Sequence, residues 1–257
     1  PNTDEKTLSQ ISTGRKDNKF GVDSQAFLEI IDFCKNSRNI DLSCLSVHIG
    51  SQILDHKPYE KMLTAIGKFI NQINYKFEYI DLGGGMGISY NNENEKLNYK
   101  KYTLAIKKFL KKHNSKIIFE PGRSIVGSIG TLISQIIYIK NSENKKFVIL
   151  DAGMNDLMRP ALYGATHKIL PIIRKKRKFR GTYEFVGPIC ESTDKFLTLK
   201  KFQELKEKDF IAICDVGAYG MSLSSNYNLR PKPIELLIKG SKIKVIKKRQ
   251  KHIDLIK

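Results

Sequence analysis

Apolar residues along the first half of the chain follow two alternating patterns, one with the spacing of helices and one with the composition of strands. The segments 24–37 and 59–73 carry them at helical spacing, with Ser24 expected as the first N-cap and Pro58 just ahead of the second helix. Segment 102–113 has the same helical spacing. A short β-rich run follows each of these helices, at 42–50, 77–82 and 115–122. Strands that alternate with helices in this way predict a parallel sheet with crossover helices.

The pattern changes near residue 125, where helical spacing gives way to β-rich segments separated by turn residues. These segments are 130–140, 145–153, 181–189, 208–217, 233–238 and 242–246. Such a succession of short strands is typical of a β-sandwich or a β-barrel. We therefore predict two domains, a partial α/β barrel over 1–124 and an all-β domain over 125–257.

Each predicted strand of the first half ends in polar or glycine residues, within the runs HIGSQ, DLGGGMG and FEPGRS. The carboxyl ends of the strands form the ligand-binding face of an α/β barrel. We therefore expect a ligand site along this edge of the sheet. The predicted strands are too few to close such a barrel, so we expect only part of one.

The glycine-rich run DLGGGMGISY at 81–90 indicates a phosphate site, because residues without a Cβ let backbone N–H groups approach a ligand closely. Its spacing fits neither the dinucleotide fingerprint nor the Walker A loop. A tight turn with close helix packing is the alternative. The run EPGR at 120–123 favours the phosphate, since Arg123 can clamp a phosphate or a carboxylate. Glu120 could hold a proton on a cofactor ring nitrogen or form a salt bridge with Arg123.

Further polar residues have both a functional and a structural interpretation. His48 ends its predicted strand on the same edge and could stack on a planar cofactor, and Ser51 could donate to a phosphate. Cys190 beside Glu191 could supply an acid–base group next to a charge-pairing group. Arginine and tyrosine together are typical of carboxylate recognition, which makes candidates of Arg159, Tyr163 and Tyr219. The remaining histidines show no partner spacing and stay unassigned: His56, His113, His167 and His252.

Composition narrows the classes of function. The formal net charge is +19, from 45 Lys and Arg against 26 Asp and Glu. That surplus would suit nucleic-acid binding, but the two basic runs, 172–180 and 242–251, lack interleaved aromatic residues. We expect solvated lysines and no nucleic-acid partner. The 4 cysteines form no CxxC pair, so we expect neither a metal site nor a disulfide framework.

The apolar segments are too short to cross a membrane, and the N-terminal run PNTDEKTLSQ lacks the apolar stretch of a secretory signal. We therefore expect a cytoplasmic protein with no membrane partner. The sequence does not begin with methionine, as is expected of a processed chain or of part of a longer protein.

Together the motifs closely resemble the diaminopimelate decarboxylases, fold-type III enzymes that use pyridoxal 5′-phosphate (PLP) and are related to ornithine and arginine decarboxylases. The runs that carry the resemblance follow the order of the family: ISTGRKDNKFGVD, HIGSQI, DLGGGMGISY, EPGRSIVG, DAGMNDLMRPALYGATH, VGPICESTD and DVGAYGMSLSSNYNLRPKP. The runs CES and MRPALY favour the diaminopimelate branch over the ornithine branch. The resemblance implies the C-terminal part of a PLP-binding barrel of the alanine racemase type, followed by a β domain.

The resemblance also assigns the cofactor to residues of the first half. Those that would hold the PLP phosphate are Ser51, Gly84, Gly85, Pro121, Gly122 and Arg123. His48 would stack on the cofactor ring, and Glu120 would keep the pyridine nitrogen protonated so that the ring withdraws electrons. Cys190 would complete the catalytic set by returning a proton to the substrate carbon after CO2 leaves.

The substrate implied by the resemblance is meso-2,6-diaminopimelate, which would lose CO2 to give L-lysine. Its carboxylates would contact Arg123, Arg159 and Tyr163. Glu191 would bind the distal ammonium, and Tyr219 would lie against both cofactor and substrate. In this family the Cys-Glu segment comes from the second subunit, which implies a homodimer with shared active sites.

One feature of the family is absent from this sequence. The PLP-binding lysine of the family lies in a Tyr-Ala-x-Lys-Ala motif on an early barrel strand, and no such motif occurs here. We therefore expect an N-terminally truncated diaminopimelate decarboxylase that is not active alone. The alternatives are a non-catalytic homologue that acts as a dimer partner, and a decarboxylase of ornithine or arginine.

Overall fold

The computed structural model describes residues 19–90 and 95–256. The contacts within the chain divide it into two compact units, Pro1–Ile125 and Val126–Lys257, which we call the barrel unit and the β unit. Each unit is described by itself. Residues 11–18 of the motif ISTGRKDNKFGVD lie outside the described residues.

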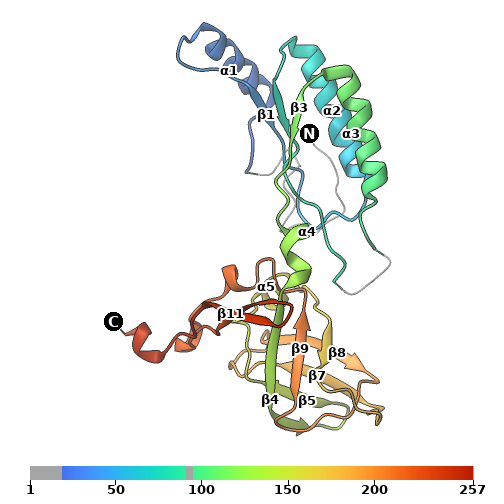
Figure 1. The fold of residues 1–257 in the computed structure, drawn as a ribbon, viewed down its shortest axis with the longest axis vertical. Helices are drawn as coiled ribbons and strands as arrows, with labels where there is room; N and C mark the ends of the chain where they lie inside the picture. The colour runs from blue at the N-terminus through green and yellow to red at the C-terminus, as the bar shows by residue number, and fades with distance from the viewer. Residues whose placement is uncertain (1–18, 91–94, 257) are drawn as a thin grey trace. The chain divides into compact units, whose positions relative to one another are not determined.

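The barrel unit is a three-stranded parallel sheet in the order β1-β2-β3, with helices connecting the strands (Figure 1). Its strands are β1 (Cys44–Ser46), β2 (Tyr79–Asp81) and β3 (Lys116–Ile118), and its helices are α1 (Ser24–Asn36), α2 (Lys57–Ile73) and α3 (Tyr99–His113). The predicted alternation of strands and helices is confirmed. The strands are shorter than predicted at both ends, and the residues that follow each strand form the loops at the carboxyl edge.

The N-cap of α1 lies one residue before the predicted one. Asp23 Oδ1 accepts hydrogen bonds from the amides of Gln25 (2.8 Å) and Ala26 (3.0 Å), and the extended backbone of Asp23 directs its side chain over the first turn. The prediction of Ser24 as the cap was therefore wrong. Aspartate and serine both cap helices well. Asp23 is the cap because its backbone is extended, whereas Ser24 is already part of the helix.

The core of the barrel unit reaches up to the glycine-rich run. Tyr59 of α2 is fully buried, with its ring centroid 4.3 Å from that of Tyr102 on α3. Its hydroxyl donates to the carbonyl of Gly84 (3.3 Å). Burial raises the pKa of both tyrosines, so both hydroxyls stay neutral. The helices thereby support the loop that follows β2.

The β unit is built on a six-stranded mixed sheet in the order β6-β9-β4-β5-β7-β8. Its strands are β4 (Thr131–Asn141), β5 (Lys146–Leu150), β6 (Ile169–Pro171), β7 (Thr182–Val186), β8 (Lys195–Lys200) and β9 (Phe210–Cys214). Strand β4 pairs antiparallel with both β5 and β9, whereas β5 and β7 are parallel. The prediction of a β-rich second half is confirmed, although β6 and β8 were not predicted.

Short helices occupy the connections of the chain. They are α4 (Arg123–Val126), α5 (Arg159–Tyr163) and the 3-10 turns Gly127–Ile129, Met221–Leu223, Tyr227–Leu229 and His252–Leu255. Within the described ranges, no helix is both long enough and apolar enough to span a membrane.

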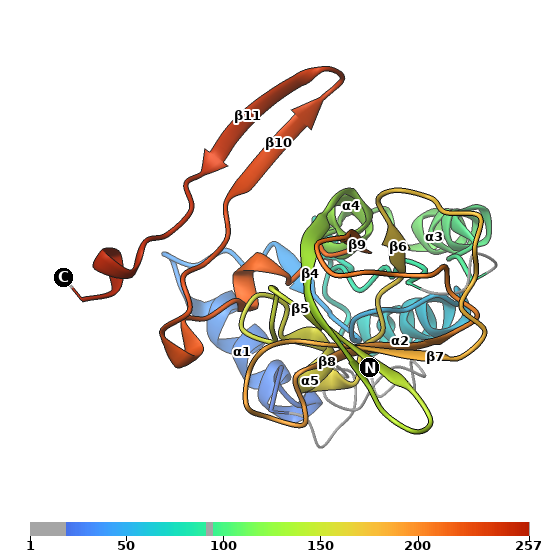
Figure 2. The same cartoon turned by 90° about the horizontal axis from the view of Figure 1, so that it is seen from below.

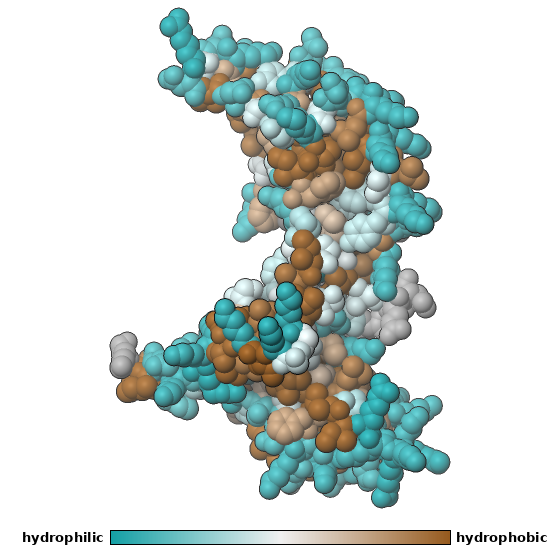
Figure 3. Space-filling model, in the orientation of Figure 1, coloured by the Kyte–Doolittle hydropathy of each residue, from teal (hydrophilic) through white to brown (hydrophobic). Residues whose placement is uncertain are grey.

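The last two strands, β10 (Glu235–Lys239) and β11 (Lys242–Lys247), form an antiparallel hairpin that stands away from the six-stranded sheet (Figure 2). Figure 3 shows apolar side chains gathered in the region of this hairpin. The exposed apolar residues of the hairpin are Leu236, Leu237, Ile238, Ile243, Val245 and Ile246. Gly240, with a φ of +59°, lies in the turn between the strands.

We expect Phe185→Ala to lower the free energy of unfolding of the β unit by about 3–5 kcal/mol, because it opens a cavity in the core. Phe185 is 0% exposed in β7 and its ring lies 5.7 Å from that of Phe202. Phe210→Ala is the matched control, since Phe210 is 49% exposed on β9. Urea unfolding monitored by near-UV circular dichroism measures both, and equal losses would contradict the assigned core.

Candidate active site

The loops that follow β2 and β3 lie side by side at the carboxyl edge of the parallel sheet. The amide of Leu82 donates to the carbonyl of Ile118 (3.0 Å), and the amide of Glu120 donates to the carbonyl of Gly83 (2.9 Å). The ladder between the two strands thus continues beyond both of them. As a result, the glycine-rich run and the EPGR turn are fixed next to each other.

The glycine-rich run also touches the loop that follows β1. The amide of Gly84 donates to Nδ1 of His48 over 3.4 Å, a long hydrogen bond. A Cβ on Gly84 would overlap the carbonyl oxygen of Glu120, and a Cβ on Gly85 would overlap that of Gly50. Gly83 and Gly85 have φ values of +64° and +83°. Three loops therefore meet at a place where only glycine fits.

Arg123 is buried at the start of α4, where two hydroxyl groups anchor its guanidinium. Nη1 donates to the hydroxyl of Tyr90 (2.6 Å) and Nη2 donates to Oγ of Ser51 (3.1 Å). The guanidinium also lies over the ring of Tyr90, 5.8 Å from its centroid. The hydroxyls are neutral, so these two bonds orient the guanidinium without cancelling its charge.

Tyr90 is a residue that the sequence analysis did not single out. It is the last residue of the run DLGGGMGISY, from which only the glycines were used to predict the phosphate site. Its position at the end of that run, opposite an arginine at the end of the next strand, was the available signal.

This edge of the sheet carries donors that fit a phosphate group. They are the hydroxyls of Ser51 and Tyr90 and the guanidinium of Arg123, whereas the amides of Gly83 and Gly84 donate to Asp81 and His48. Glycines with positive φ form concave loops in which N–H groups converge on an anion. Glu120 and Gly122 are exposed on the adjoining turn, and Pro121 between them is half-buried. The residues predicted to hold the PLP phosphate therefore lie together.

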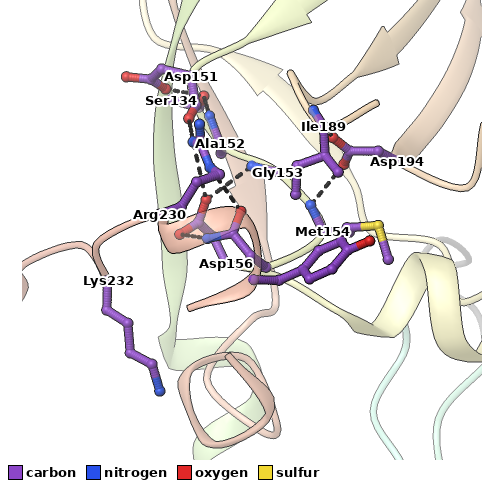
Figure 4. A network of polar contacts seen from close by, with 12 residues as sticks. Ser134, Asp151, Ala152, Gly153, Met154, Asp156, Ile189, Asp194, Arg230 and Lys232 are labelled. Atoms are coloured by element: carbon purple, nitrogen blue, oxygen red, sulfur yellow. Dashed lines mark hydrogen bonds and ion pairs between the residues drawn. The ribbon is translucent and has the colours of Figure 1, made fainter. Parts of the chain in front are cut away.

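In the β unit, Cys190 and Glu191 lie exposed in the turn between β7 and β8, and Asp194 holds this turn in place (Figure 4). Oδ2 of Asp194 accepts a hydrogen bond from the amide of Ile189 (2.8 Å). Oδ1 accepts one from the amide of Met154 (2.7 Å), in the loop between β5 and α5. The carboxylate thus ties the turn to the loop that leads to Arg159.

Asp194 occupies a closely packed site. The side chain is buried, and burial raises its pKa against the opposing effect of the hydrogen bonds from Ile189 and Met154. The amide of Gly187 donates to the main-chain carbonyl of Asp194 (2.9 Å). A Cβ on Gly187 would overlap the carboxylate, so this turn also requires glycine.

The loop between β5 and α5 is held from its other side by a second group of polar contacts (Figure 4). Arg230 donates through Nε to Oδ1 of the fully buried Asn155 (3.0 Å) and through Nη2 to the carbonyl of Asp151. Oδ1 of Asp151 accepts from the hydroxyl of Ser134 (2.5 Å). Burial raises the pKa of Asp156, which lies beside Arg230. The loop is therefore fixed on both sides.

The carboxylate of Glu191 accepts hydrogen bonds from two hydroxyl groups. One comes from Tyr227, in the segment before the hairpin, and the other from Oγ1 of Thr193 (3.3 Å). The hydrogen bond to Glu191 raises the pKa of Tyr227, because loss of its proton would place two negative charges together. Tyr227 is a second residue that was not predicted.

The remaining candidates lie on α5 and after β9. Arg159 begins α5 and is buried, whereas Tyr163 ends the same helix and is half-buried. Arg159 Nη1 lies 2.8 Å from Nε2 of His167, a histidine that the sequence analysis left unassigned. The partner was missed because α5 ends in a turn that brings residues 159 and 167 together. Tyr219 is exposed in the turn after β9, with a φ of +62°.

The candidate residues thus lie in both units. The barrel unit carries the donors for a phosphate, and the β unit carries the Cys190–Glu191 turn and the loop that leads to Arg159. Among the residues that the structure describes, no cluster of His, Cys, Asp or Glu could hold a metal ion.

Comparison with known proteins gives consistent results. The family model described as "Pyridoxal-dependent decarboxylase, pyridoxal binding domain" matches residues 1–127. The diaminopimelate decarboxylase of Helicobacter pylori is 44% identical over 258 residues, which cover 99% of this chain and 64% of that protein. That of Aquifex aeolicus is 38% identical over 256 residues, covering 98% and 60%. The crystal structure of the Helicobacter pylori enzyme complexed with L-lysine superposes with a TM-score of 0.92 at 43% identity, over 99% of this chain and 64% of the other.

The chain is a homologue of the diaminopimelate decarboxylases. It belongs with the fold-type III PLP-dependent decarboxylases, and the predicted fold, part of a PLP-binding barrel followed by a β domain, is confirmed. The chain spans about 60–64% of the length of these relatives.

We expect Gly84→Ala to destabilise the barrel unit of this decarboxylase homologue, because the added Cβ would push the glycine run away from Glu120. Gly122→Ala is the matched control for stability, since a Cβ there meets nothing within 4 Å. Thermal unfolding should show a fall in Tm of several degrees for the first variant only, at about 2–8 °C per kcal/mol for domains of about 60 to 250 residues. An equal Tm for the two variants would contradict the close approach of the loops.

We expect Asp194→Asn to release one of the two amides that its carboxylate holds, because an amide side chain offers a single acceptor oxygen. Hydrogen exchange should then quicken at either Met154 or Ile189, and at both in Asp194→Ala. The amide of Gly187 is the internal control, since it donates to the main-chain carbonyl of Asp194. Unchanged exchange at Met154 and Ile189 would contradict the bracing role.

Proposed function

We propose that this chain acts in the PLP-dependent decarboxylation of meso-2,6-diaminopimelate to L-lysine and CO2. The observation that carries the proposal is the buried guanidinium of Arg123, oriented by Ser51 and Tyr90 beside a glycine-rich run. In the proposal, residues 1–124 form the cofactor-binding part of the barrel and residues 125–257 form the β domain. Because the sequence holds no Tyr-Ala-x-Lys-Ala motif, activity requires a lysine-bearing segment in addition.

The barrel unit would bind the cofactor. Bound PLP would supply a ring that withdraws electrons from the bond to the leaving carboxylate. The amides of Gly84 and Gly85, with Ser51 and Arg123, would hold its phosphate. Glu120 would keep a proton on the pyridine nitrogen. His48, next to the glycine run, and the turn residues Pro121 and Gly122 would complete the contacts around the cofactor.

The β unit would bind the substrate and return the proton. Arg159 and Tyr163 would bind a carboxylate, with Arg123 and Tyr219 close to cofactor and substrate. Glu191 would bind the distal ammonium, which suits a carboxylate oriented by two hydroxyl groups. Cys190 would donate a proton to the substrate carbon. The L-lysine in the Helicobacter pylori structure supports a diamino acid ligand of this kind.

We further propose that the protein works as a homodimer in the cytoplasm. In that assembly the turn with Cys190 and Glu191 would complete the site of the second subunit. Both residues are exposed in this chain, as such a role requires. Neither nucleic acid nor a membrane takes part in the proposed function.

The test is to supply the chain with the lysine-bearing N-terminal segment of the Helicobacter pylori relative. We expect the resulting protein to retain PLP, seen by its visible absorbance after dialysis, and to release CO2 from meso-diaminopimelate. Release of CO2 from ornithine or arginine, but not from meso-diaminopimelate, would refute the proposed substrate. Purification in a PLP-free complex with a full-length decarboxylase would instead favour a non-catalytic dimer partner.

We expect Arg123→Met to weaken retention of PLP by about ten- to a hundredfold, because it removes a charge-assisted hydrogen-bond donor from the phosphate site. Arg177→Met is the matched control, since the side chain of Arg177 is 82% exposed. Equilibrium dialysis against PLP measures both variants. Equal affinities of the two variants for PLP would show that Arg123 does not bind the phosphate.

A further inference from the structure

The hydroxyl of Tyr59 lies against the peptide bond between Gly84 and Gly85. It donates to the carbonyl of Gly84 over 3.3 Å, which is long for an O–H···O hydrogen bond, and a Cβ built on Gly85 would lie 3.3 Å from the same hydroxyl oxygen. A carbonyl has no proton to give, so the hydroxyl is the donor. Tyr59 is fully buried, so no solvent replaces the carbonyl as its acceptor.

Each carbonyl of the three consecutive glycines has a donor within the chain. The amide of Glu120 donates to the carbonyl of Gly83 (2.9 Å), and the amide of Ile53 donates to the carbonyl of Gly85 (2.9 Å). Tyr59 supplies the donor for the carbonyl between them. The outer two contacts are made by backbone groups, whereas the middle contact is made by a side chain and can be removed by a substitution.

The amides of the same run are not all used. The amide of Gly83 donates to Oδ1 of Asp81 (2.8 Å), and the amide of Gly84 donates to Nδ1 of His48 (3.4 Å). Among the residues that the structure describes, the amide of Gly85 has no acceptor. Gly85 is half-buried at the carboxyl edge of the sheet. Its N–H is therefore a donor that the run keeps for a ligand.

The planarity of the peptide couples the bound carbonyl to the open amide. In a trans peptide the carbonyl of one residue and the N–H of the next point in opposite directions. Because Tyr59 holds the carbonyl of Gly84 toward the core, the N–H of Gly85 points away from the core. Rotation of this peptide would bury the tyrosine hydroxyl without a partner and would turn a carbonyl oxygen outward.

The local sequence alone does not prevent this rotation. A peptide rotates through ψ of the residue before it and φ of the residue after it, and here both residues are glycine. The rotation would leave the contacts made by Glu120 and Ile53 in place, because those belong to the neighbouring peptides. The hydrogen bond from Tyr59 is therefore the contact that selects one orientation.

We propose that Tyr59 is a positioning residue whose hydroxyl fixes the Gly84–Gly85 peptide, so that the N–H of Gly85 and not a carbonyl oxygen faces a phosphate group. The inference rests on the proposed function, which identifies this phosphate as that of PLP. A rotated peptide would direct the negative end of its dipole at the anion. Tyr59 is buried and acts on the ligand only through the backbone.

A role in packing alone makes a different prediction. Tyr59→Phe keeps the ring, whose centroid lies 4.3 Å from that of Tyr102, and removes only the hydroxyl. Tyr102→Phe is the matched control, because Tyr102 is also buried and its hydroxyl has no hydrogen-bond partner among the described residues. If only the packing of the two rings mattered, both variants would bind phosphate as the wild type does.

The first measurement is a titration of the chain without cofactor with inorganic phosphate, followed by nuclear magnetic resonance at a temperature where all three proteins are folded. We expect phosphate to move the amide proton of Gly85 downfield in the wild type and in Tyr102→Phe. In Tyr59→Phe the phosphate concentration at half-saturation should rise about three- to tenfold. Equal half-saturation in the three proteins, or a Gly85 amide that does not respond in the wild type, would overturn the inference.

The wild type alone provides an independent check that holds even if Tyr59→Phe does not fold. A nuclear Overhauser effect should connect the hydroxyl proton of Tyr59 to an Hα of Gly85, since a Cβ in place of that hydrogen would lie 3.3 Å from the hydroxyl oxygen. Absence of this effect, with the hydroxyl proton observed, would overturn the inference.

The second measurement compares PLP with pyridoxal, which lacks the phosphate, on the protein supplied with the lysine-bearing segment. Equilibrium dialysis should show that Tyr59→Phe weakens binding of PLP about three- to tenfold and leaves binding of pyridoxal unchanged. A general defect of the fold would weaken both, so equal losses for the two compounds would overturn the positioning role.

The two measurements separate the inference from the proposed function. A protein that binds inorganic phosphate in a way that depends on Tyr59, but neither retains PLP nor releases CO2 from a diamino acid, would refute the proposed function and support the positioning role. An active decarboxylase in which Tyr59→Phe binds phosphate and PLP as the wild type does would refute the positioning role and leave the function standing.

Discussion

The pairing between β2 and β3 does not stop where the strands end, and the candidate phosphate site depends on this continuation. The amide of Glu120 donates to the carbonyl of Gly83, which fixes the glycine-rich run against the turn that leads to Arg123. A Cβ on Gly84 would force the two apart. The position of the guanidinium therefore follows from a parallel strand pair and from the absence of one side chain.

The two arginines proposed to bind anions share one physical feature. Hydroxyl groups of Ser51 and Tyr90 orient Arg123, and the imidazole of His167 orients Arg159. Elsewhere in the β unit the opposite arrangement occurs. Glu184 pairs with Lys145 and Lys195; its burial alone would raise its pKa, but these hydrogen bonds lower it overall.

Local patterns were enough to predict the helices and strands of the barrel unit, because periodicity acts over short distances. Contacts made by reversal of the chain were not predictable in the same way. His167 meets Arg159 only after the turn at Gly164, and Tyr227 meets Glu191 across a long stretch of sequence. Strand β6 was not predicted because it has three residues and ends in proline, which is unfavourable in a strand. The run KFLTLK of β8 does alternate as a strand should, and its prediction was missed.

The position of β4 has a consequence for the order of folding. Its hairpin with β5 closes over a short connection, as in the pairing of Asn141 with Lys146. Its other neighbour is β9, where Thr131 pairs with Cys214. Most of the β unit must therefore leave the ribosome before the middle of the sheet can close. Until then β4 has one bare edge, and the long separation in sequence makes this closure slow.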